Sequence, residues 1–231
     1  MLSKALGANW QHQGPLGKVE RLVLIMFFSI AAYLQLVGKI GNIGGFSYFE
    51  WLMILFIVLG QLTVFNRLKA QLRECAVLDW LKYKNINKKV AVIYDSQTGN
   101  TKKAAVSAAE ALDAEAVSVQ NIAKKDLSSF DFVIFAAPNL GRRIIPEGMK
   151  NLIEGLKVKN YALLMTSGMP VFRIYSGLRC KKYFEEKLGK SAVNTINIKG
   201  FHQKAKTYKG HPDDKDLTDA YLFAAKSYER I

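Results

Sequence analysis

Two long apolar runs fill much of the first third of the chain, and shorter apolar runs follow them. The first run is LVLIMFFSIAAYLQLV at residues 22–37, and the second is FSYFEWLMILFIVLGQLTVF at residues 46–65. Each approaches the roughly 20 apolar residues that a helix needs to cross a bilayer, and we extend the first toward residue 40. The pattern predicts two transmembrane helices, at about residues 20–40 and 46–66. Two core helices of a soluble protein are the plain alternative.

Basic residues lie mostly outside these two runs. The connection GKIGNIGG at residues 38–45 holds only Lys39. Three basic residues precede the first run and five follow the second: Lys4, Lys18 and Arg21, then Arg67, Lys69, Arg73, Lys82 and Lys84. Because positive residues stay on the cytoplasmic side, this asymmetry predicts a hairpin with both ends in the cytoplasm.

Residues 65–84 continue the second run with a mixed helical pattern. Leu68, Leu72 and Leu81 recur at spacings close to three and four, which predicts a helix. This helix either extends the second span into the cytoplasm or lies on the lipid headgroups. The segment 85–87, Asn-Ile-Asn, breaks the pattern, and we place the domain boundary there. The predicted domains are a membrane hairpin with a linker helix at 1–87 and a second domain at 88–231.

Short apolar runs alternate with helical patterns throughout the second domain. Strands are expected at residues 90–94, 116–120, 132–137, 161–166 and 192–198, and helices at 100–112, 146–156, 174–188 and 213–228. The unbroken apolar run at 132–137 is typical of a strand covered on both faces. This alternation predicts an α/β fold with a doubly wound, five-stranded parallel sheet, in which ligands bind beyond the carboxyl ends of the strands.

A hydroxyl-rich turn, DSQTGNT at residues 95–101, joins the first strand to its helix. The hydroxyls of Ser96, Thr98 and Thr101 can converge on a phosphate with the amide of Asn100 and the free N–H groups of the helix start. Gly99 permits close approach of the backbone. No Gly-Lys-Ser/Thr follows, which disfavours a P-loop NTPase. A simple helix cap of Ser and Thr is the other interpretation.

The segment Ser-x-Thr-Gly-Asn-Thr after a first strand resembles the FMN-phosphate loop of flavodoxins, and the similarity extends from about residue 88 to the C-terminus. The resemblance implies FMN as the cofactor, with the loops at 138–145 and 167–175 enclosing the isoalloxazine ring. The candidate cofactor-binding residues are Ser96, Gln97, Thr98, Gly99, Asn100, Thr101, Pro138, Asn139, Leu140, Gly141, Ser167, Gly168, Met169 and Tyr175. No catalytic residue or metal ligand is predicted.

The chain departs from the usual flavodoxin pattern in two ways. Flavodoxins commonly stack a Trp and a Tyr on the ring, but residues 137–143 hold no aromatic, and Phe172 and Tyr175 are the nearest candidates. Arg142, Arg143 and Arg173 also fall in or beside the ring loops, whereas typical flavodoxins are acidic. These cations either favour the reduced flavin, by on the order of 1 kcal/mol, or contact lipid or partner carboxylates. A fold that has lost its flavin is a further alternative.

A net charge of +14, from 33 Lys and Arg against 19 Asp and Glu, indicates an anionic neighbour such as a lipid surface or an acidic protein. No nucleic-acid recognition motif accompanies this charge, so nucleic acid is not an expected partner. Cys75 and Cys180 form no disulfide framework, which fits a reducing compartment. The connection at 200–212 carries His202, His211 and several lysines, and is expected to be a solvated basic loop without a metal site.

These patterns and the resemblance together predict a membrane-anchored electron-transfer protein. It would use FMN to exchange electrons with a membrane or cytoplasmic redox protein, and its location would be the cell membrane, with two passes. One alternative is a quinone-coupled flavodoxin-like oxidoreductase, of which bacterial protoporphyrinogen oxidase is an example. Another is an accessory subunit of a membrane complex that uses the fold as an interaction surface.

Overall fold

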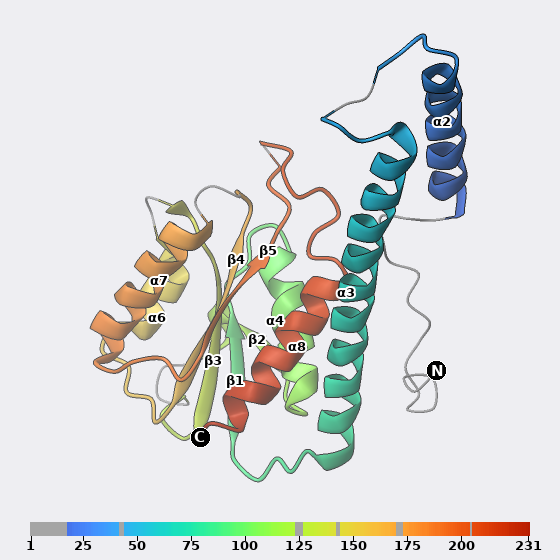
Figure 1. Ribbon diagram of the computed structural model, residues 1–231. Coiled ribbons are helices and arrows are strands. Elements are labelled where there is room, and N and C mark those ends of the chain that lie inside the picture. The colour runs from blue at the N-terminus through green and yellow to red at the C-terminus, as the bar shows by residue number, and fades with distance from the viewer. Residues whose placement is uncertain (1–17, 42–43, 123–126, 142–143, 170–172, 204) are drawn as a thin grey trace. The chain divides into compact units, whose positions relative to one another are not determined.

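A computed structural model describes residues 18–41, 44–122, 127–141, 144–169, 173–203 and 205–231 (Figure 1). The chain divides into two compact units, Met1–Ala76 and Val77–Ile231, and each is described by itself. The sequence-based boundary between residues 87 and 88 stays a prediction.

The first unit contains the predicted hairpin helices. Helix α2 spans Lys18–Leu36 and helix α3 spans Tyr48–Tyr83. Helix α2 ends before residue 40 because Gly38 adopts a left-handed φ of 69°, the usual glycine stop of a helix. Helix α3 begins with a capping box, in which the Ser47 N–H donates to the Glu50 carboxylate at 2.7 Å and the Glu50 N–H donates to the Ser47 hydroxyl at 3.3 Å.

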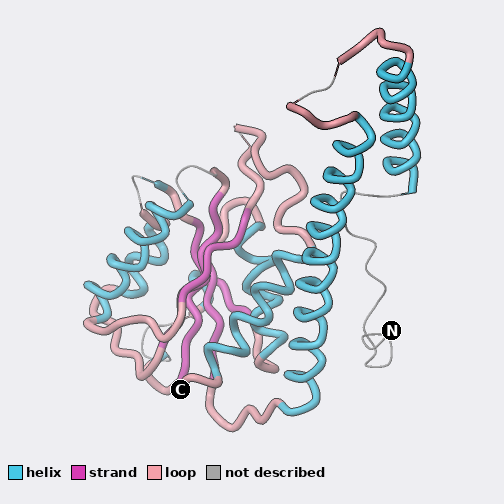
Figure 2. Tube along the Cα trace, in the orientation of Figure 1, coloured by secondary structure: helices cyan, strands magenta, loops and turns pink. Residues whose placement is uncertain are grey.

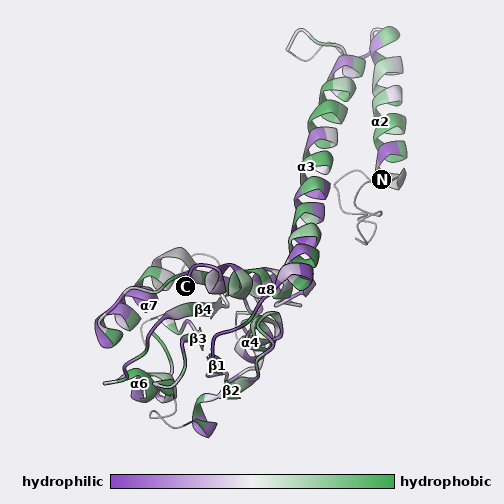
Figure 3. Cartoon of the chain, turned by 90° about the horizontal axis from the view of Figure 1, so that it is seen from below, coloured by the Kyte–Doolittle hydropathy of each residue, from purple (hydrophilic) through white to green (hydrophobic). Residues whose placement is uncertain are grey.

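Both helices of this unit are rich in hydrophobic residues, as the green colouring of Figure 3 shows along α2 and the first part of α3. Among the described residues, α3 is the one helix long and apolar enough to cross a membrane, and the apolar part of α2 is shorter. Helix α3 runs without a break through residues 65–84 as far as Tyr83. Of the two alternatives for that segment, the structure therefore has a continuous extension of the second apolar run.

The second unit is built on a parallel sheet (Figures 1 and 2). Its strands are β1 (Val90–Tyr94), β2 (Ala116–Ser118), β3 (Phe132–Pro138), β4 (Tyr161–Ser167) and β5 (Thr195–Lys199), in the order β2-β1-β3-β4-β5. Its helices are α4 (Asn100–Ala111), α6 (Glu147–Ile153), α7 (Arg173–Leu188) and α8 (Asp214–Tyr228), with the 3-10 turn η1 at Val119–Asn121. All adjacent strands pair in parallel, which confirms the predicted five-stranded doubly wound fold.

The core of this unit has two layers, one on each face of the sheet. Helices α4 and α8 cover one face, and helices α6 and α7 cover the other (Figure 1). Along the central strands, Ile134 and Leu164 point toward α4 and α8, whereas their neighbours Phe135 and Leu163 point toward α6 and α7. This alternation explains why β3 reads as an unbroken apolar run, since both of its faces are covered.

Three predicted element boundaries of the second unit differ from the structure by two residues or more, each for a local reason. Strand β2 stops at Ser118, two residues early, because its only neighbour β1 ends at the facing residue Tyr94. Strand β5 begins at Thr195 rather than at residue 192, because its pairing with β4 starts there. Helix α6 ends before the predicted residue 156, where Gly155 takes a left-handed φ of 69°.

Candidate functional site

A cavity of about 270 Å³ opens at the carboxyl ends of the strands. Eight of the predicted cofactor residues line it: Gln97, Thr98, Asn100, Pro138, Asn139, Leu140, Ser167 and Gly168. The remaining lining residues come from the end of β4 and from the segment after β5: Thr166, Gly200, Phe201, His202 and Gln203. Three separate loops thus meet where the fold predicts a ligand, joined by a fourth segment that the sequence did not indicate.

The loop after β1 leaves the start of helix α4 open. Gly99 precedes the helix with a φ of 85°, and no side chain caps the first turn. The Ser96 hydroxyl accepts a hydrogen bond from the Gly99 N–H at 3.1 Å, which shapes the turn itself. Uncapped N–H groups and the positive end of a helix dipole are the donor set that suits a phosphate.

Thr101 is placed differently from the other residues of this loop. Its side chain is buried, and its hydroxyl lies 2.7 Å from the hydroxyl of Thr166 at the end of β4. This pair fixes α4 against the sheet beneath the cavity.

The loop after β3 is tied to the end of β4 by Asn139. Its backbone N–H donates to the Thr166 carbonyl at 2.8 Å, and its amide nitrogen donates to the Ser167 hydroxyl at 3.3 Å. The amide oxygen accepts from the Gly141 N–H at 3.2 Å. Asn139 therefore holds two of the cavity loops in a fixed relation.

The loop after β4 packs closely against the segment after β5. A Cβ added at Gly168 would lie 2.6 Å from the Cβ of His202, so only glycine fits this position. The Thr207 hydroxyl also donates to the Gly168 carbonyl. The basic connection at 200–212 is thus joined to the cavity through His202 and Thr207, while its Lys206 and Lys209 are exposed, as in the predicted solvated loop.

Residues 91–201, which carry strands β1 to β5, match the family model described as a flavodoxin domain. This match marks residues 91–201 as a flavodoxin-like domain. Such a domain indicates a flavin-binding redox protein, and flavodoxins typically bind FMN. No curated protein matches the chain.

Solved flavodoxin structures resemble this domain. Flavodoxin 1 of Bacillus cereus is 17% identical, with 62% of this chain and 99% of that chain covered and a TM-score of 0.46. A flavodoxin of Streptococcus pneumoniae TIGR4 is 16% identical, with 62% and 99% covered and a TM-score of 0.48. The Trp repressor binding protein of Bacillus subtilis is 18% identical, with 58% and 97% covered and a TM-score of 0.44.

The described residues that line the candidate cavity fit a flavin phosphate. The uncapped α4 start and the exposed Thr98 offer neutral donors, and Gly99 leaves room because no atom lies within 4 Å of an added Cβ. Amides and hydroxyls of Gln97, Asn139 and Ser167 surround the rest of the cavity. This set suits a ligand with one anionic end and several polar edges.

Six predicted cofactor residues do not line the cavity: Ser96, Gly99, Thr101, Gly141, Met169 and Tyr175. Met169 is 38% exposed beside the Gly168 loop, and Tyr175 is 67% exposed on α7. Arg142, Arg143 and Phe172 lie outside the described residues, as does the side chain of Arg173. Whether these residues contact a flavin stays a prediction.

Asp95 is a buried carboxylate directly before the phosphate loop. Burial raises the pKa of Asp95, and a hydrogen bond from the Met149 N–H partly offsets this shift. The carboxylate approaches α6 so closely that a Cβ added at Gly148 would lie 2.9 Å from its Oδ2. Asp95 therefore joins the end of β1 to the start of α6.

His211, Asp213 and Asp216 form a cluster whose ligand-type atoms lie within 4.8 Å of one another. The sequence indicated no metal site because no acid lies between His202 and His211, yet Asp213 and Asp216 follow His211. Both carboxylates are used in the capping box of α8, in which Asp213 accepts from the Asp216 N–H at 2.9 Å. The Asp216 carboxylate also contacts the His211 ring. Capping of α8 accounts for this cluster.

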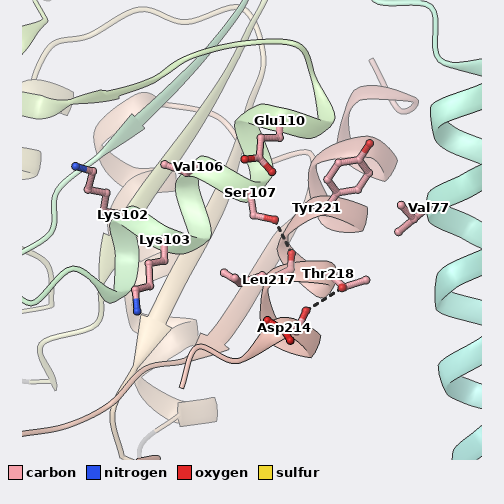
Figure 4. Close-up of a pocket in the computed structure, with 10 residues that line it drawn as sticks. All are labelled: Val77, Lys102, Lys103, Val106, Ser107, Glu110, Asp214, Leu217, Thr218 and Tyr221. Atoms are coloured by element: carbon pink, nitrogen blue, oxygen red, sulfur yellow. Dashed lines mark hydrogen bonds between the residues drawn. The ribbon is translucent and has the colours of Figure 1, made fainter. Parts of the chain in front are cut away.

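A second cavity, of about 490 Å³, lies apart from the candidate flavin site (Figure 4). Its lining residues all come from helices, mainly α4 and α8, and none from the carboxyl ends of the strands. Lys102 and Lys103 line it together with Glu110 and Asp214, so its charges are mixed. A bond from the Ser107 hydroxyl to the Leu217 carbonyl, at 2.8 Å, crosses between the two helices.

Proposed function

We propose that this protein is a membrane-anchored flavodoxin-like electron carrier that holds FMN at the carboxyl edge of its sheet. The observation that carries the proposal is the cavity bounded by the open start of α4 and the loops after β3 and β4. It lies in a flavodoxin domain, and the same chain has a helix of membrane-spanning length.

The described residues supply binding and orientation in this proposal. The N–H groups at the start of α4 hold the phosphate, while Asn139 and Ser167 orient the polar edge of the ring system. When bound, FMN supplies the electron-accepting and electron-donating chemistry. Among the described lining residues, His202 is the only titratable side chain, which favours a carrier over an acid–base enzyme.

Anchoring by the two N-terminal helices completes the proposal. Helix α3 is long enough to span the membrane, and we place α2 as a second pass, with both termini and the flavodoxin domain in the cytoplasm. The basic residues that flank the two apolar runs support this orientation. Confinement to the membrane plane raises the effective concentration of the carrier beside a membrane partner.

An exposed apolar surface supports contact with a redox protein. Tyr175 and Leu178 on α7 are 67% and 62% exposed, and Met169 beside the cavity is 38% exposed. Arg179 lies on the same helix and is also exposed. Exposed aromatic and apolar residues next to a basic group suit a transient contact with a partner that carries carboxylates.

The electron-carrier role is tested by following the oxidation state of the bound flavin. The full-length chain is purified in detergent, reduced with dithionite, separated from excess reductant and mixed with membranes that contain redox proteins. We expect reoxidation by the membranes, and no catalytic turnover of soluble quinone. Rapid turnover of quinone would support the oxidoreductase instead, and a purified chain without flavin that takes up no FMN would contradict both.

A further inference from the structure

The segment after β5 encloses the candidate flavin site, although it lies far along the chain from the loops that the sequence indicated. We propose that residues 200–203 of this segment are a fourth wall of the flavin pocket, in which Phe201 and His202 provide the aromatic contacts to the ring system. This inference rests on the proposed FMN site and names the residues that recognise its ring.

The aromatic side chains that line the cavity support this assignment. Phe201 and His202 both line the cavity, and they are the only aromatic side chains among its described lining residues. The loop after β3 contributes Pro138, Asn139 and Leu140 to the lining, and none of these three is aromatic. A flat isoalloxazine system packs best on aromatic faces and edges. In the described part of the pocket, such surfaces come from the segment after β5.

The segment is fixed to both neighbouring loops. The Gly200 N–H donates to the Ser167 carbonyl at 3.0 Å, which continues the pairing of β5 with β4. The amide nitrogen of Asn100, in the first turn of α4, donates to the Phe201 carbonyl at 2.9 Å. The Thr207 hydroxyl donates to the Gly168 carbonyl. The two aromatic residues are therefore held beside the phosphate loop and the β4 loop at once.

The hydrogen bonds of His202 define which ring nitrogen is a donor. Its Nδ1 accepts from the Ala205 N–H at 2.9 Å, so the neutral ring carries its proton on Nε2. The His202 N–H donates to the Thr207 carbonyl at 3.1 Å, which closes a short antiparallel bridge. His202 thus offers the cavity an aromatic ring with one N–H donor, which suits a flavin because its ring bears carbonyl and nitrogen acceptors.

Three leucine variants test this assignment in the full-length chain. Phe201→Leu and His202→Leu each remove a ring that lines the cavity, whereas Tyr83→Leu removes an exposed ring at the end of α3 that does not. The readouts are the dissociation constant for FMN, from fluorescence titration, and the residual fluorescence of bound FMN. Phe201→Tyr keeps the aromatic ring and serves as the conservative variant. Urea unfolding checks that every variant remains folded.

We expect Phe201→Leu and His202→Leu to raise the FMN dissociation constant by about 2- to 12-fold, the range for loss of one aromatic contact. Bound FMN should also fluoresce more strongly in these two variants, while Tyr83→Leu and Phe201→Tyr should match the parent. Unchanged affinity and fluorescence in the folded leucine variants at 201 and 202 would overturn the assignment. An equal effect of Tyr83→Leu would do the same. If the parent chain bound no FMN, the proposed function itself would be contradicted.

Discussion

At the scale of the residue, Gly99 has a left-handed backbone conformation and lies in the phosphate loop. Gly155 has a similar conformation, with φ of 69° against 85°, but ends α6 outside the cavity. Neither glycine has an atom within 4 Å of an added Cβ, so alanine introduces backbone strain without a clash. We expect Gly99→Ala and Gly155→Ala each to lower the unfolding free energy by roughly 1 kcal/mol.

Only Gly99→Ala should also weaken FMN binding, because the strain at that position distorts the start of α4. Urea denaturation measures the stability of both variants, and fluorescence titration measures their FMN affinity. Equal FMN affinity in the two variants would show that the conformation of Gly99 is not part of the site.

The raised pKa of Asp95 leads us to predict an unusual pH dependence of stability. Because burial raises the pKa of Asp95, the folded protein binds this proton more tightly than the unfolded chain does. Its contribution to stability therefore falls as pH rises from the ordinary carboxyl range through the raised pKa. We expect Asp95→Asn to be more stable than the parent at neutral pH, with the difference vanishing in acid. Urea midpoints measured from about pH 7 down to about pH 3 check this.

Asp131 provides a control with the opposite sign. Hydrogen bonds from the Lys159 ammonium and the Lys89 N–H lower the pKa of Asp131, so its stabilising effect is present at neutral pH and lost as pH falls through the lowered pKa. Asp131→Asn should therefore be less stable than the parent at neutral pH. If Asp95→Asn were also less stable there, the buried carboxylate would be a stabilising group and the account of Asp95 would be wrong.

The residues of the phosphate loop could be proposed from a local pattern, whereas the loops after β3 and β4 were proposed from the resemblance to flavodoxins. The turn at 95–101 shows its hydroxyls, its glycine and its helix within a few residues, so its pattern is visible locally. Phe201 was missed because its link to Asn100 spans 101 residues and uses a backbone carbonyl, which any residue type has. The pairing of Thr101 with Thr166 was invisible for the same reason, since it depends on the register between α4 and β4.

At the scale of the element, the last turns of α3 help to build the core of the flavodoxin unit. Trp80 is 9% exposed, its indole N–H donates to the Ala111 carbonyl at 2.7 Å, and its ring meets Tyr228 edge-on at 6.2 Å. Trp80→Ala should lower the unfolding free energy by about 3–5 kcal/mol through the lost packing. Trp80→Phe keeps much of the ring but leaves the Ala111 carbonyl without its donor, and should cost about 1–3 kcal/mol.

Leu81 is the matched control for this prediction, since it is the next residue of α3 but 50% exposed. Leu81→Ala should change the unfolding free energy by less than about 0.5 kcal/mol. Urea denaturation of the full-length chain in detergent, followed by far-UV circular dichroism, compares the three variants. Similar losses for Trp80→Ala and Leu81→Ala would mean that the end of α3 is not part of this core.

Element types followed from the sequence more readily than element boundaries did. The apolar runs predicted β1, β3 and β4 because these central strands must be apolar on both faces. The ends of β2 and β5 depend on where the neighbouring strand begins or ends, which the pattern of one segment does not encode. The continuity of α3 was left open because a spanning helix and a headgroup helix share the same periodicity.

At the scale of the whole molecule, the membrane anchor can be tested within a single helix. Ile57 and Leu72 both lie on α3 and are each 61% exposed, but only Ile57 is inside the predicted second span. An arginine near the centre of a span costs about 2.5–3.5 kcal/mol of insertion free energy. We expect Ile57→Arg to be lost from alkali-washed membranes, whereas Leu72→Arg should remain there. Equal retention of both variants would contradict the anchor.

The central claim is that the loops at the carboxyl edge of the sheet hold one FMN per chain. Its most direct test is a titration of the detergent-purified, flavin-free full-length chain with FMN, followed by absorption and fluorescence. The account predicts saturable binding near one FMN per chain, with a flavin spectrum shifted from that of free FMN. A chain that is folded by circular dichroism but takes up no FMN would contradict it.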